Sequence, residues 1–428
     1  MIDPNLIMND FAETSRRLQR KGVSAAEIAV TRDAGKARAD LLREVERLRE
    51  RRNDLSRSIG GLMKDGKKDD AETARSEAAS LRTHLDGLEQ ELRALELRFR
   101  DHMLRLPNLP DDAAPDGQDE SHNVVRETIG YDPADYSGKT YRPHWEIAEE
   151  LGIYDLKRAS KITGAMFAIL RGQGAKLMRA LINLAFELNE DKYTEHVVPT
   201  FVNSDTFTGT GQLPKFEIDA YRIRDDDLWA IPTGEVPLTG MHRDEILGLE
   251  ELPKRYMTYT SCFRREAGAA GKDTRGMQRL HEFHKVELVR LCPPEQVQAE
   301  FQDLLKDAIR PIALLKLPYR IVDLCTGDLG NSSSRIFDIE VYSPGVDRWL
   351  EVSSVGIFTD YQMRRSNIRF RRSDTGRLEF PFALNGSGLA TPRVWAAILE
   401  HYQQPDGSVL VPEPLRRFMG KDRIVKNP

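Results

Sequence analysis

The strongest constraint on the fold is a proline-free stretch, residues 37–105, in which apolar residues recur at alternating spacings of four and three. A 3.5-residue apolar repeat places these side chains on one stripe of a helix, where they form the seam of a coiled coil. The repeat is interrupted by GGLMKDGKKDD, residues 60–70, where glycines and charged residues favour a turn. We therefore predict two antiparallel helices that pair as a projecting arm. Arg52 takes one seam position, and the others are Leu41, Val45, Leu48, Leu55, Ile59, Leu81, Leu85, Leu88, Leu92, Leu95 and Phe99.

The charge of this arm does not by itself select a partner, because the stretch carries 16 Lys or Arg residues against 15 Asp or Glu residues. A solvated two-helix stalk or a dimerisation zipper would show the same pattern. The whole chain has a formal net charge of −5, which gives no overall attraction for nucleic acid. Nucleic acid would have to be held by local basic side chains, for which the candidates in the arm are Arg49, Arg51, Lys67 and Lys68.

A segment rich in Pro, Asp and Gly, residues 106–120, follows the arm and marks a boundary, so we place the domains at 1–110 and 111–428. Three cysteines lie about thirty residues apart without a C-x-x-C pair, which supports neither a zinc site nor a disulfide framework. The N-terminus has acidic residues where a signal peptide has basic ones, and no apolar run approaches a membrane span. We therefore expect a cytoplasmic protein without a membrane partner.

A second informative segment, residues 262–287, reads CFRREAGAAGKDTRGMQRLHEFHKVE. Strand side chains alternate between two faces, so Arg264 and Glu266 should share a face on which Phe283 of the returning strand also lies. Arginine offers planar donors to a phosphate, a carboxylate accepts from an exocyclic amine, and an aromatic ring stacks on a base. The segment therefore predicts a hairpin that binds a nucleoside triphosphate, with an ordinary charged hairpin as the alternative. Its Gly/Ala-rich loop carries two cations, Lys272 and Arg275.

This hairpin resembles motif 2 of the class II aminoacyl-tRNA synthetases, in the version of the seryl-tRNA synthetases. The arm is similar to the N-terminal antiparallel coiled coil with which that family reaches the long variable arm of its tRNA. The order and spacing of the segments carry the resemblance, which runs from residue 1 to about residue 424. The further matching segments are GAMFAILRGQGAKLMRALINLAFELNEDKYTEHVVPTF (164–201), IPTGEVPLT (231–239), DRWLEVSSVGIFTDYQMRR (347–365) and FPFALNGSGLATPRVWAAILEHYQQPDGSVLVPEPLRRFM (380–419).

The resemblance implies an α+β fold, in which the coiled-coil arm precedes a class II catalytic domain built on an antiparallel sheet flanked by helices. It implies a serine–tRNA ligase that activates L-serine with ATP to seryl-adenylate and transfers it to the 3′ end of tRNA(Ser), with tRNA(Sec) as a second candidate acceptor. Segment 164–201 resembles motif 1, which implies a homodimer, and reads as strand, long helix and strand. Its helix would equally suit a plain core helix, since its apolar positions are Leu177, Leu181, Leu184 and Leu188.

The site residues that the resemblance implies fall into four sets. The catalytic residues are Arg264 and Arg393. The L-serine site comprises Thr233, Gly234, Glu235, Glu287 and Ser387. The ATP site comprises Arg264, Arg265, Glu266, Arg275, Leu280, Phe283, Glu351, Val352, Ser353, Ser354 and Arg393. Carboxylate and hydroxyl oxygens suit Mg²⁺, and the implied magnesium ligands are Glu351 and Ser354.

Individual roles also follow from the resemblance. Thr233 and Glu235, two apart on a segment expected to be extended, meet the α-amino group of serine, which needs acceptors. Glu287 and Ser387 meet the serine hydroxyl. Asn385–Gly388 should end a strand, and a helix should begin near Thr391 with Pro392 in its first turn.

Two departures from the family pattern stand out. Gly234 occupies a position where Ala or Ser is more usual, and we expect it to loosen the backbone slightly. Val355, Gly356 and Ile357 replace a small polar run such as Cys-Ser-Asn. The replacement indicates either a repacked pocket wall or a reshaped one that excludes bulky seryl-adenylate mimics, as a resistance copy would require.

Three rival interpretations share these motifs. A homologue that loads an amino acid onto a carrier protein would lack the arm. A non-catalytic RNA-binding paralogue would not need the charged residues of the proposed site. A specialised or resistance paralogue would catalyse the same reaction with altered inhibitor sensitivity, and the sequence leaves this alternative open.

Overall fold

The computed structural model describes residues 1–267 and 275–426. The chain divides into two compact units. The first is Ile2–Leu106, which we call the arm unit. The second is Pro107–Pro428 together with Met1, which we call the sheet unit. The predicted loop cation Lys272 lies outside the described residues.

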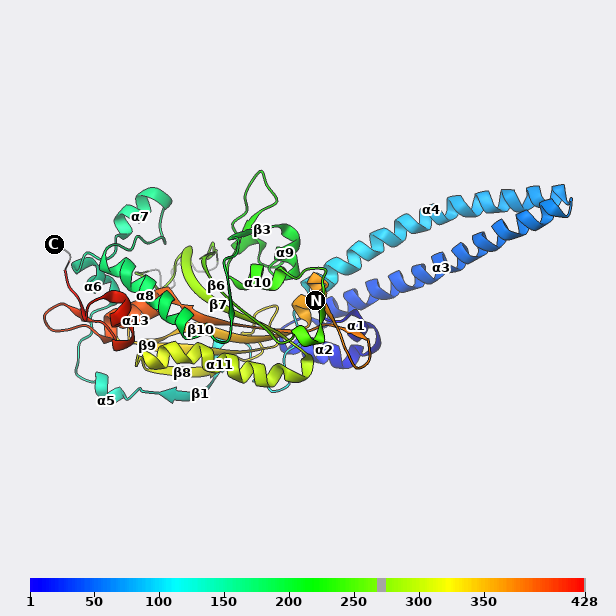
Figure 1. Cartoon of the computed structure of the whole chain (residues 1–428). Helices are drawn as coiled ribbons and strands as arrows, with labels where there is room; N and C mark the ends of the chain where they lie inside the picture. The colour runs from blue at the N-terminus through cyan, green and yellow to red at the C-terminus, as the bar shows by residue number, and fades with distance from the viewer. Residues whose placement is uncertain (268–274, 427–428) are drawn as a thin grey trace. The chain divides into compact units, whose positions relative to one another are not determined.

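The arm unit is built on two long antiparallel helices (Figure 1). Its helices are α1 (Pro4–Asn9), α2 (Phe11–Arg20), α3 (Ala25–Lys64) and α4 (Lys68–Arg105). Val45, Leu85 and Leu92 are buried between α3 and α4, with further leucines of the predicted seam packed around them. The predicted antiparallel pair is confirmed, but α3 begins well before residue 37, because the Ser24 hydroxyl caps it by accepting from the Glu27 N–H.

The sheet unit is organised around one large sheet that has eight strands among the described residues. All neighbours in it are antiparallel except β2 and β6. In spatial order the strands are β1 (Val124–Ile129), β8 (Tyr319–Asp323), β9 (Arg335–Ser343), β10 (Arg348–Thr359), β13 (Phe382–Ala390), β7 (Glu282–Cys292), β6 (Lys254–Phe263) and β2 (Thr194–His196). The predicted hairpin is therefore confirmed as β6 and β7.

Helices pack on this sheet (Figure 1), and the unit also contains smaller sheets. The helices are α5 (Pro133–Tyr136), α6 (His144–Glu150), α7 (Leu156–Thr163), α8 (Gln173–Glu187), α9 (Ser204–Gly209), α10 (Glu235–Gly240), α11 (Val297–Leu314), α12 (Tyr361–Ser366), α13 (Thr391–His401) and α14 (Glu413–Met419). The small sheets pair β3 (Phe201–Val202) with β4 (Trp229–Ala230), β11 (Arg369–Arg371) with β5 (Ile246–Gly248) and β12 (Leu378–Glu379), and β14 (Val409–Leu410) with β15 (Arg423–Ile424).

The main hydrophobic core joins α8, α11 and α13 to the central strands. Strand alternation divides β7 between this core and the opposite face, because Val286 and Leu288 are core residues whereas Phe283 and Lys285 line a cleft. The helix predicted from residue 391, with Pro392 in its first turn, is confirmed as α13.

One local expectation is wrong. The start of segment 164–201 is not a strand, because its contribution is a single bridge between Leu170 and Tyr154 that precedes α8. The beginning of the predicted boundary segment, residues 106–110, is buried. The Asn108 side chain donates to the carbonyl oxygens of Phe358 at 2.8 Å and Ser332 at 3.0 Å.

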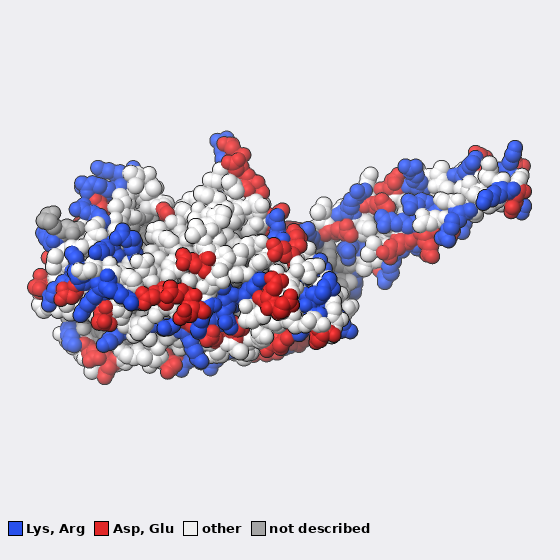
Figure 2. Space-filling model, viewed as in Figure 1, with Lys and Arg blue, Asp and Glu red and all other residues white. Residues whose placement is uncertain are grey.

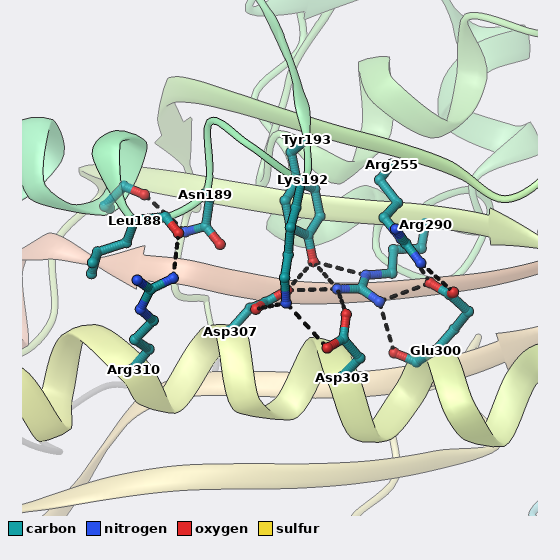
Figure 3. A network of polar contacts seen from close by, with 11 residues as sticks. Leu188, Asn189, Lys192, Tyr193, Arg255, Arg290, Glu300, Asp303, Asp307 and Arg310 are labelled. Atoms are coloured by element: carbon teal, nitrogen blue, oxygen red, sulfur yellow. Dashed lines mark hydrogen bonds and ion pairs between the residues drawn. The ribbon is translucent and has the colours of Figure 1, made fainter.

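A buried ion network ties three elements of the sheet unit together (Figure 3). Arg290 of β7 is fully buried, and its guanidinium donates to Glu300 at 2.7 Å and Asp307 at 2.6 Å, both on α11. It also donates to the Tyr193 hydroxyl, which follows α8 and in turn donates to Asp307 at 2.8 Å. The network fixes the back of the strand that carries Phe283.

Across the described part of the chain, no helix combines the length and the apolar character that crossing a membrane requires.

Candidate active site

A cleft of about 710 Å³ in the sheet unit gathers most of the predicted site residues. They come from the β6–β7 hairpin, the start of α10, the middle of β10 and the junction of β13 with α13. These strands are neighbours in the order β10-β13-β7-β6, so the sheet topology brings the segments together. The predicted residues that line the cleft are Thr233, Glu235, Arg264, Glu266, Leu280, Phe283, Glu351, Val352, Ser354, Ser387 and Arg393.

Arg264 and Glu266 reach the cleft from a turn and not from the predicted strand. Strand β6 ends at Phe263, and Glu266 has a φ of 51°, in the left-handed region. The Arg264 guanidinium lies over the Phe283 ring, 5.0 Å from its centroid. The Glu266 carboxylate pairs with Arg279 at 2.7 Å, a partner that the strand pattern did not indicate.

Two of the predicted ATP residues, Arg265 and Arg275, are exposed and are not among the residues that line the cleft. Arg265 instead fixes the turn, because its N–H donates to the Asp219 carbonyl oxygen at 2.9 Å.

Thr233 and Glu235 both line the cleft, but not from the extended segment that we expected. Helix α10 begins at Glu235, whose N–H donates to the Thr233 Oγ1 at 3.2 Å. The Thr233 hydroxyl in turn donates to Glu287 Oε2 at 2.5 Å. This turn holds the hydroxyl and the Glu235 carboxylate on one side without a strand.

Glu287 is fully buried and lies behind Thr233, outside the set of cleft-lining residues. Its other partners are Lys285, which forms an ion pair with Oε2, and Asn385, whose amide donates to Oε1 at 2.5 Å. Lys285 and Asn385 both line the cleft and were not predicted as site residues. The alternation that places Phe283 and Glu287 on one face includes Lys285 and could have revealed it.

Glu235 is a buried carboxyl that forms no ion pair among the described residues. The Gln362 amide donates to it at 2.6 Å. Burial and the nearby charge of Glu287 raise the pKa of Glu235 to about 7, against the hydrogen bond from Gln362. Gln362 comes from α12, more than a hundred residues further along the chain, and nothing in the local sequence pattern pointed to it.

Gly234 lies in a close approach, where an added Cβ would meet side chains of β6 and β7. A Cβ at this position would lie 2.7 Å from the Thr258 Cγ2 and 3.1 Å from the Glu287 Cβ. Its φ of −63° is an ordinary value, so the constraint is the space beside β6 and not the backbone conformation.

The residues predicted to hold Mg²⁺ lie on β10, where the register shifts between Glu351 and Ser353. Glu351 and Ser354 line the cleft, while the Ser353 hydroxyl donates to the Ser387 carbonyl oxygen at 3.0 Å. Asp338 lies on β9, where it pairs with Ser354 of β10. The buried Oδ1 of its carboxyl has no hydrogen-bond partner among the described residues. Burial and the charge of Glu351 raise the pKa of Asp338 well above its usual range.

This donor set fits a magnesium ion. Mg²⁺ takes oxygen ligands, keeps several waters and is commonly held by one or two carboxylates plus substrate phosphates. Among the described residues no group of three or more His, Cys, Asp or Glu side chains is placed to hold a metal ion.

Arg393 lies in the first turn of α13 and bridges two walls of the cleft. Its Nε donates to the Gln278 carbonyl oxygen at 3.1 Å, and its Nη1 donates to the Glu351 carbonyl oxygen at 2.6 Å. The guanidinium therefore connects the end of the hairpin loop with the strand that carries the proposed metal ligands.

Two segments of the chain match family models. Residues 1–110 match the seryl-tRNA synthetase N-terminal domain, and residues 215–402 match the tRNA synthetase class II core domain (G, H, P, S and T). The serine–tRNA ligase of Syntrophotalea carbinolica is 47% identical over 423 residues, which cover 98% of this chain and 98% of the relative. The chain belongs to the seryl-tRNA synthetase family.

Other members are similar along the full length. The serine–tRNA ligase of Bacillus subtilis is 44% identical over 429 residues, covering 100% of both chains. The crystal structure of the seryl-tRNA synthetase from Pyrococcus horikoshii complexed with ATP superimposes with a TM-score of 0.93 at 32% identity, covering 100% of both chains. The predicted α+β fold, with a paired-helix arm and a class II sheet domain, is confirmed.

The departure from the family pattern at residues 355–357 lies mainly in the core. Val355 and Ile357 are buried in the main hydrophobic cluster, and neither lines the cleft. A Cβ on Gly386 would lie 3.3 Å from the Val355 Cγ2 and 3.4 Å from Leu304 of α11, which places Val355 against that helix. This placement favours the repacking account over a reshaped pocket wall.

The candidate tRNA-binding cations of the arm differ in their surroundings. Arg49 pairs with Glu89 at 2.8 Å and Arg51 pairs with Glu77 at 3.0 Å, in both cases across the two helices. Lys67 and Lys68 are exposed where α3 turns into α4. Figure 2 shows acidic and basic side chains interspersed along the visible face of the arm, in agreement with its balanced charge.

Proposed function

We propose that this chain activates L-serine with ATP and transfers the seryl group to the 3′ end of tRNA(Ser), as a serine–tRNA ligase. The observation that carries the proposal is the convergence in one cleft of acceptors for an ammonium group, arginines for phosphates and an aromatic ring for a base. Its full-length relatives named as serine–tRNA ligases support it, as does its likeness to a seryl-tRNA synthetase structure that contains ATP.

In the first step a carboxylate oxygen of serine attacks the α-phosphorus of ATP, the bond to the bridging oxygen breaks, and pyrophosphate leaves. The step depends on positioning and charge neutralisation, because no side chain has to form a bond. We assign the α-phosphate to Arg264, and the outer phosphates to Arg393 and Arg275. Glu266 would accept from the adenine amine, and Phe283 would stack on the ring.

Glu351 and Ser354 would hold Mg²⁺, which when bound would supply positive charge to offset that of the ATP phosphates. In the second step the terminal ribose hydroxyl of the tRNA attacks the carbonyl carbon of seryl-adenylate, an ester forms, and AMP leaves. The arm is assigned to tRNA binding through phosphate contacts, which position a nucleic acid without reading its sequence.

Serine selection is assigned to both ends of the amino acid. Thr233 and Glu235 would accept from the α-amino group, while Ser387 and Glu287 would meet the side-chain hydroxyl. Because Glu287 lies behind Thr233, it could act on the substrate directly or by orienting the Thr233 hydroxyl. Sites that hydrogen-bond a substrate hydroxyl reject analogues lacking it by ~10⁴ to 10⁵.

The decisive test is ATP–pyrophosphate exchange with each of the twenty amino acids. We expect serine to support exchange far better than threonine, alanine or glycine, and preference for another amino acid would overturn the proposal. In the same assay, Glu287→Ala should lose most of the preference for serine over alanine. If Glu287→Ala instead raises the serine KM but keeps the preference, Glu287 acts by orienting Thr233.

We also propose that the protein is a homodimer, since segment 164–201 resembles the motif that forms the dimer interface in class II synthetases. Apolar side chains lie exposed after the short edge strand β2: Val197 is 97% exposed and Phe201 is 40% exposed. Light scattering on the purified chain should give twice the monomer mass, and Val197→Asp should reduce it. The predicted cytoplasmic location stays a prediction.

A further inference from the structure

A buried histidine outside the predicted site holds one wall of the ATP cleft. His144, the first residue of α6, is fully buried, and so is its partner Glu400 near the end of α13. The His144 Nδ1 lies 2.8 Å from Glu400 Oε1, and its Nε2 accepts from the Met277 N–H at 2.9 Å. Met277 follows the hairpin loop and lines the cleft.

These partners determine which ring nitrogen of His144 carries the hydrogen. A backbone N–H can only donate, so Nε2 must be the unprotonated nitrogen, and Nδ1 carries the hydrogen that is donated to Glu400. Glu400 itself is held by further donors: the N–H of His144 at 3.0 Å, the N–H of Gly345 at 3.1 Å and the hydroxyl of Ser343. Burial acts to raise the pKa of Glu400, but the hydrogen bonds from the His144 side chain, the Ser343 hydroxyl and the His144 N–H lower it.

The contact is close enough to restrict the sequence before Met277. Gly276 has a φ of 64°, and a Cβ on it would lie 2.2 Å from the His144 Nε2. The glycine therefore allows the chain to pass against the imidazole ring. The histidine and the glycine together set where the backbone leaves the hairpin loop.

Gln278, which follows Met277, connects this segment to the proposed phosphate site. The Gln278 carbonyl oxygen accepts from Arg393, which lies on the same helix as Glu400 and seven residues before it. Seven residues are about two helical turns, so both side chains project from one side of α13. Segment 277–278 is thus held at two points, by His144 backed by Glu400 and by Arg393 directly.

We propose that His144 is a positioning residue for ATP, which acts by holding segment 276–280 against Arg393. The inference rests on the proposed function, because it takes the cleft to be the ATP site. Removing the acceptor at Nε2 leaves the Met277 N–H buried and unsatisfied, so the segment shifts and Arg393 loses its placement. Serine binding depends on other segments and should change little.

Three substitutions of His144 distinguish the roles of its two ring nitrogens. His144→Gln places an amide oxygen near the position of Nε2, His144→Asn keeps a polar group only near Nδ1, and His144→Phe keeps neither. We expect Asn and Phe to raise the KM for ATP in serine-dependent exchange about ten-fold, the order set by losing one buried hydrogen bond. The Gln variant should stay within about three-fold of the wild type.

The matched control is His401→Gln on the same helix, because the His401 Nε2 contacts the Tyr342 carbonyl oxygen at 2.7 Å and not the segment. It should leave the KM for ATP unchanged. Hydrogen exchange of a peptide containing Met277 provides a readout independent of activity. Its amides should exchange faster in His144→Asn than in the wild type, His144→Gln or His401→Gln.

An unchanged ATP KM in folded His144→Asn and His144→Phe would overturn the inference, as would an equal rise in the KM values for ATP and serine. If neither variant folds, Ser343→Ala carries the test: it removes one donor to Glu400, and an ATP KM equal to that of the wild type would count against the inference. Absence of exchange in the wild type would instead remove the proposed function, and the hydrogen-exchange comparison would still decide whether His144 holds the segment.

Discussion

Two buried carboxyls of the proposed serine site, Glu235 and Glu287, have different partners. Glu287 accepts hydrogen bonds from Thr233 and Asn385 and forms an ion pair with Lys285. Glu235 accepts a hydrogen bond from the Gln362 amide. Burial and the charge of Glu287 raise the pKa of Glu235 to about 7, so the carboxyl assigned to the substrate ammonium titrates near neutrality.

This difference predicts a pH dependence of serine binding. An ammonium group favours ionised Glu235, whose pKa is about 7, so the serine KM should rise as the pH falls below that value, by up to about ten-fold per unit. Serine KM values from exchange assays between pH 5.5 and 8.5 would measure this. Glu235→Gln should show a high KM with a flat profile, and a flat profile in the wild type would contradict the assignment.

The stability of the unliganded protein should have the opposite dependence. The folded pKa of Glu235 is raised above its unfolded value, so its burial costs least when the group is protonated. Stability should therefore fall as the pH rises from about 4.5 through 7, and Glu235→Gln should reduce that fall.

The space around Gly234 supports a second prediction at this scale. Gly234→Ala should raise the serine KM about ten-fold, because the added methyl group overlaps Thr258 on β6 and displaces the Thr233–Glu235 turn. Thr258→Ser removes the overlapping methyl group and keeps the hydroxyl, so the double variant should recover most of the loss. Additive effects in this double-mutant cycle would show that the two positions are not coupled.

At the scale of single elements, the sequence predicted the right neighbours with partly wrong conformations. Residues two apart were expected to share a face because strands alternate, yet Thr233 and Glu235 lie on a helix start, and Arg264 and Glu266 lie on a turn. Spacing alone does not distinguish these geometries, since each can point both side chains into one cleft. Gln362 and Asp338 could not be predicted, because distant elements bring them to the site.

The third prediction concerns β10. Changing Val355, Gly356 and Ile357 to Cys, Ser and Asn would place polar groups in the main core, at a cost of about 1–3 kcal/mol. We expect a lower melting temperature, with inhibition by a seryl-adenylate mimic within two-fold of the wild type. Stronger inhibition of the variant with an unchanged melting temperature would support the resistance hypothesis instead.

At the scale of the molecule, the predictability of the two units differs for a physical reason. A coiled-coil seam follows from a local repeat of apolar residues, so the periodicity of residues 37–105 was sufficient to predict the paired helices. The large sheet pairs strands far apart in the chain, such as β13 with β7 and β1 with β8. Strand periodicity does not specify such an order, and the resemblance to a family implied only an antiparallel sheet flanked by helices.

The fourth prediction tests the functions of the arm unit and the sheet unit separately. Replacing residues 37–105 with a short Gly/Ser linker should spare serine-dependent exchange, because every described residue of the cleft belongs to the sheet unit. Transfer of serine to tRNA should fall by at least 100-fold, by loss of the phosphate contacts assigned to the arm. Equal loss of both activities would show that the arm supports the folding of the sheet unit.

The position of α13 in the chain has a consequence for synthesis of the protein. Arg393 and Glu400 lie on α13, while Gln278 and His144, which they hold, were translated more than a hundred residues earlier. A growing chain therefore has no complete nucleotide cleft until α13 has left the ribosome. Stabilisation by bound ATP, which requires the folded site, becomes available only after α13 has been translated.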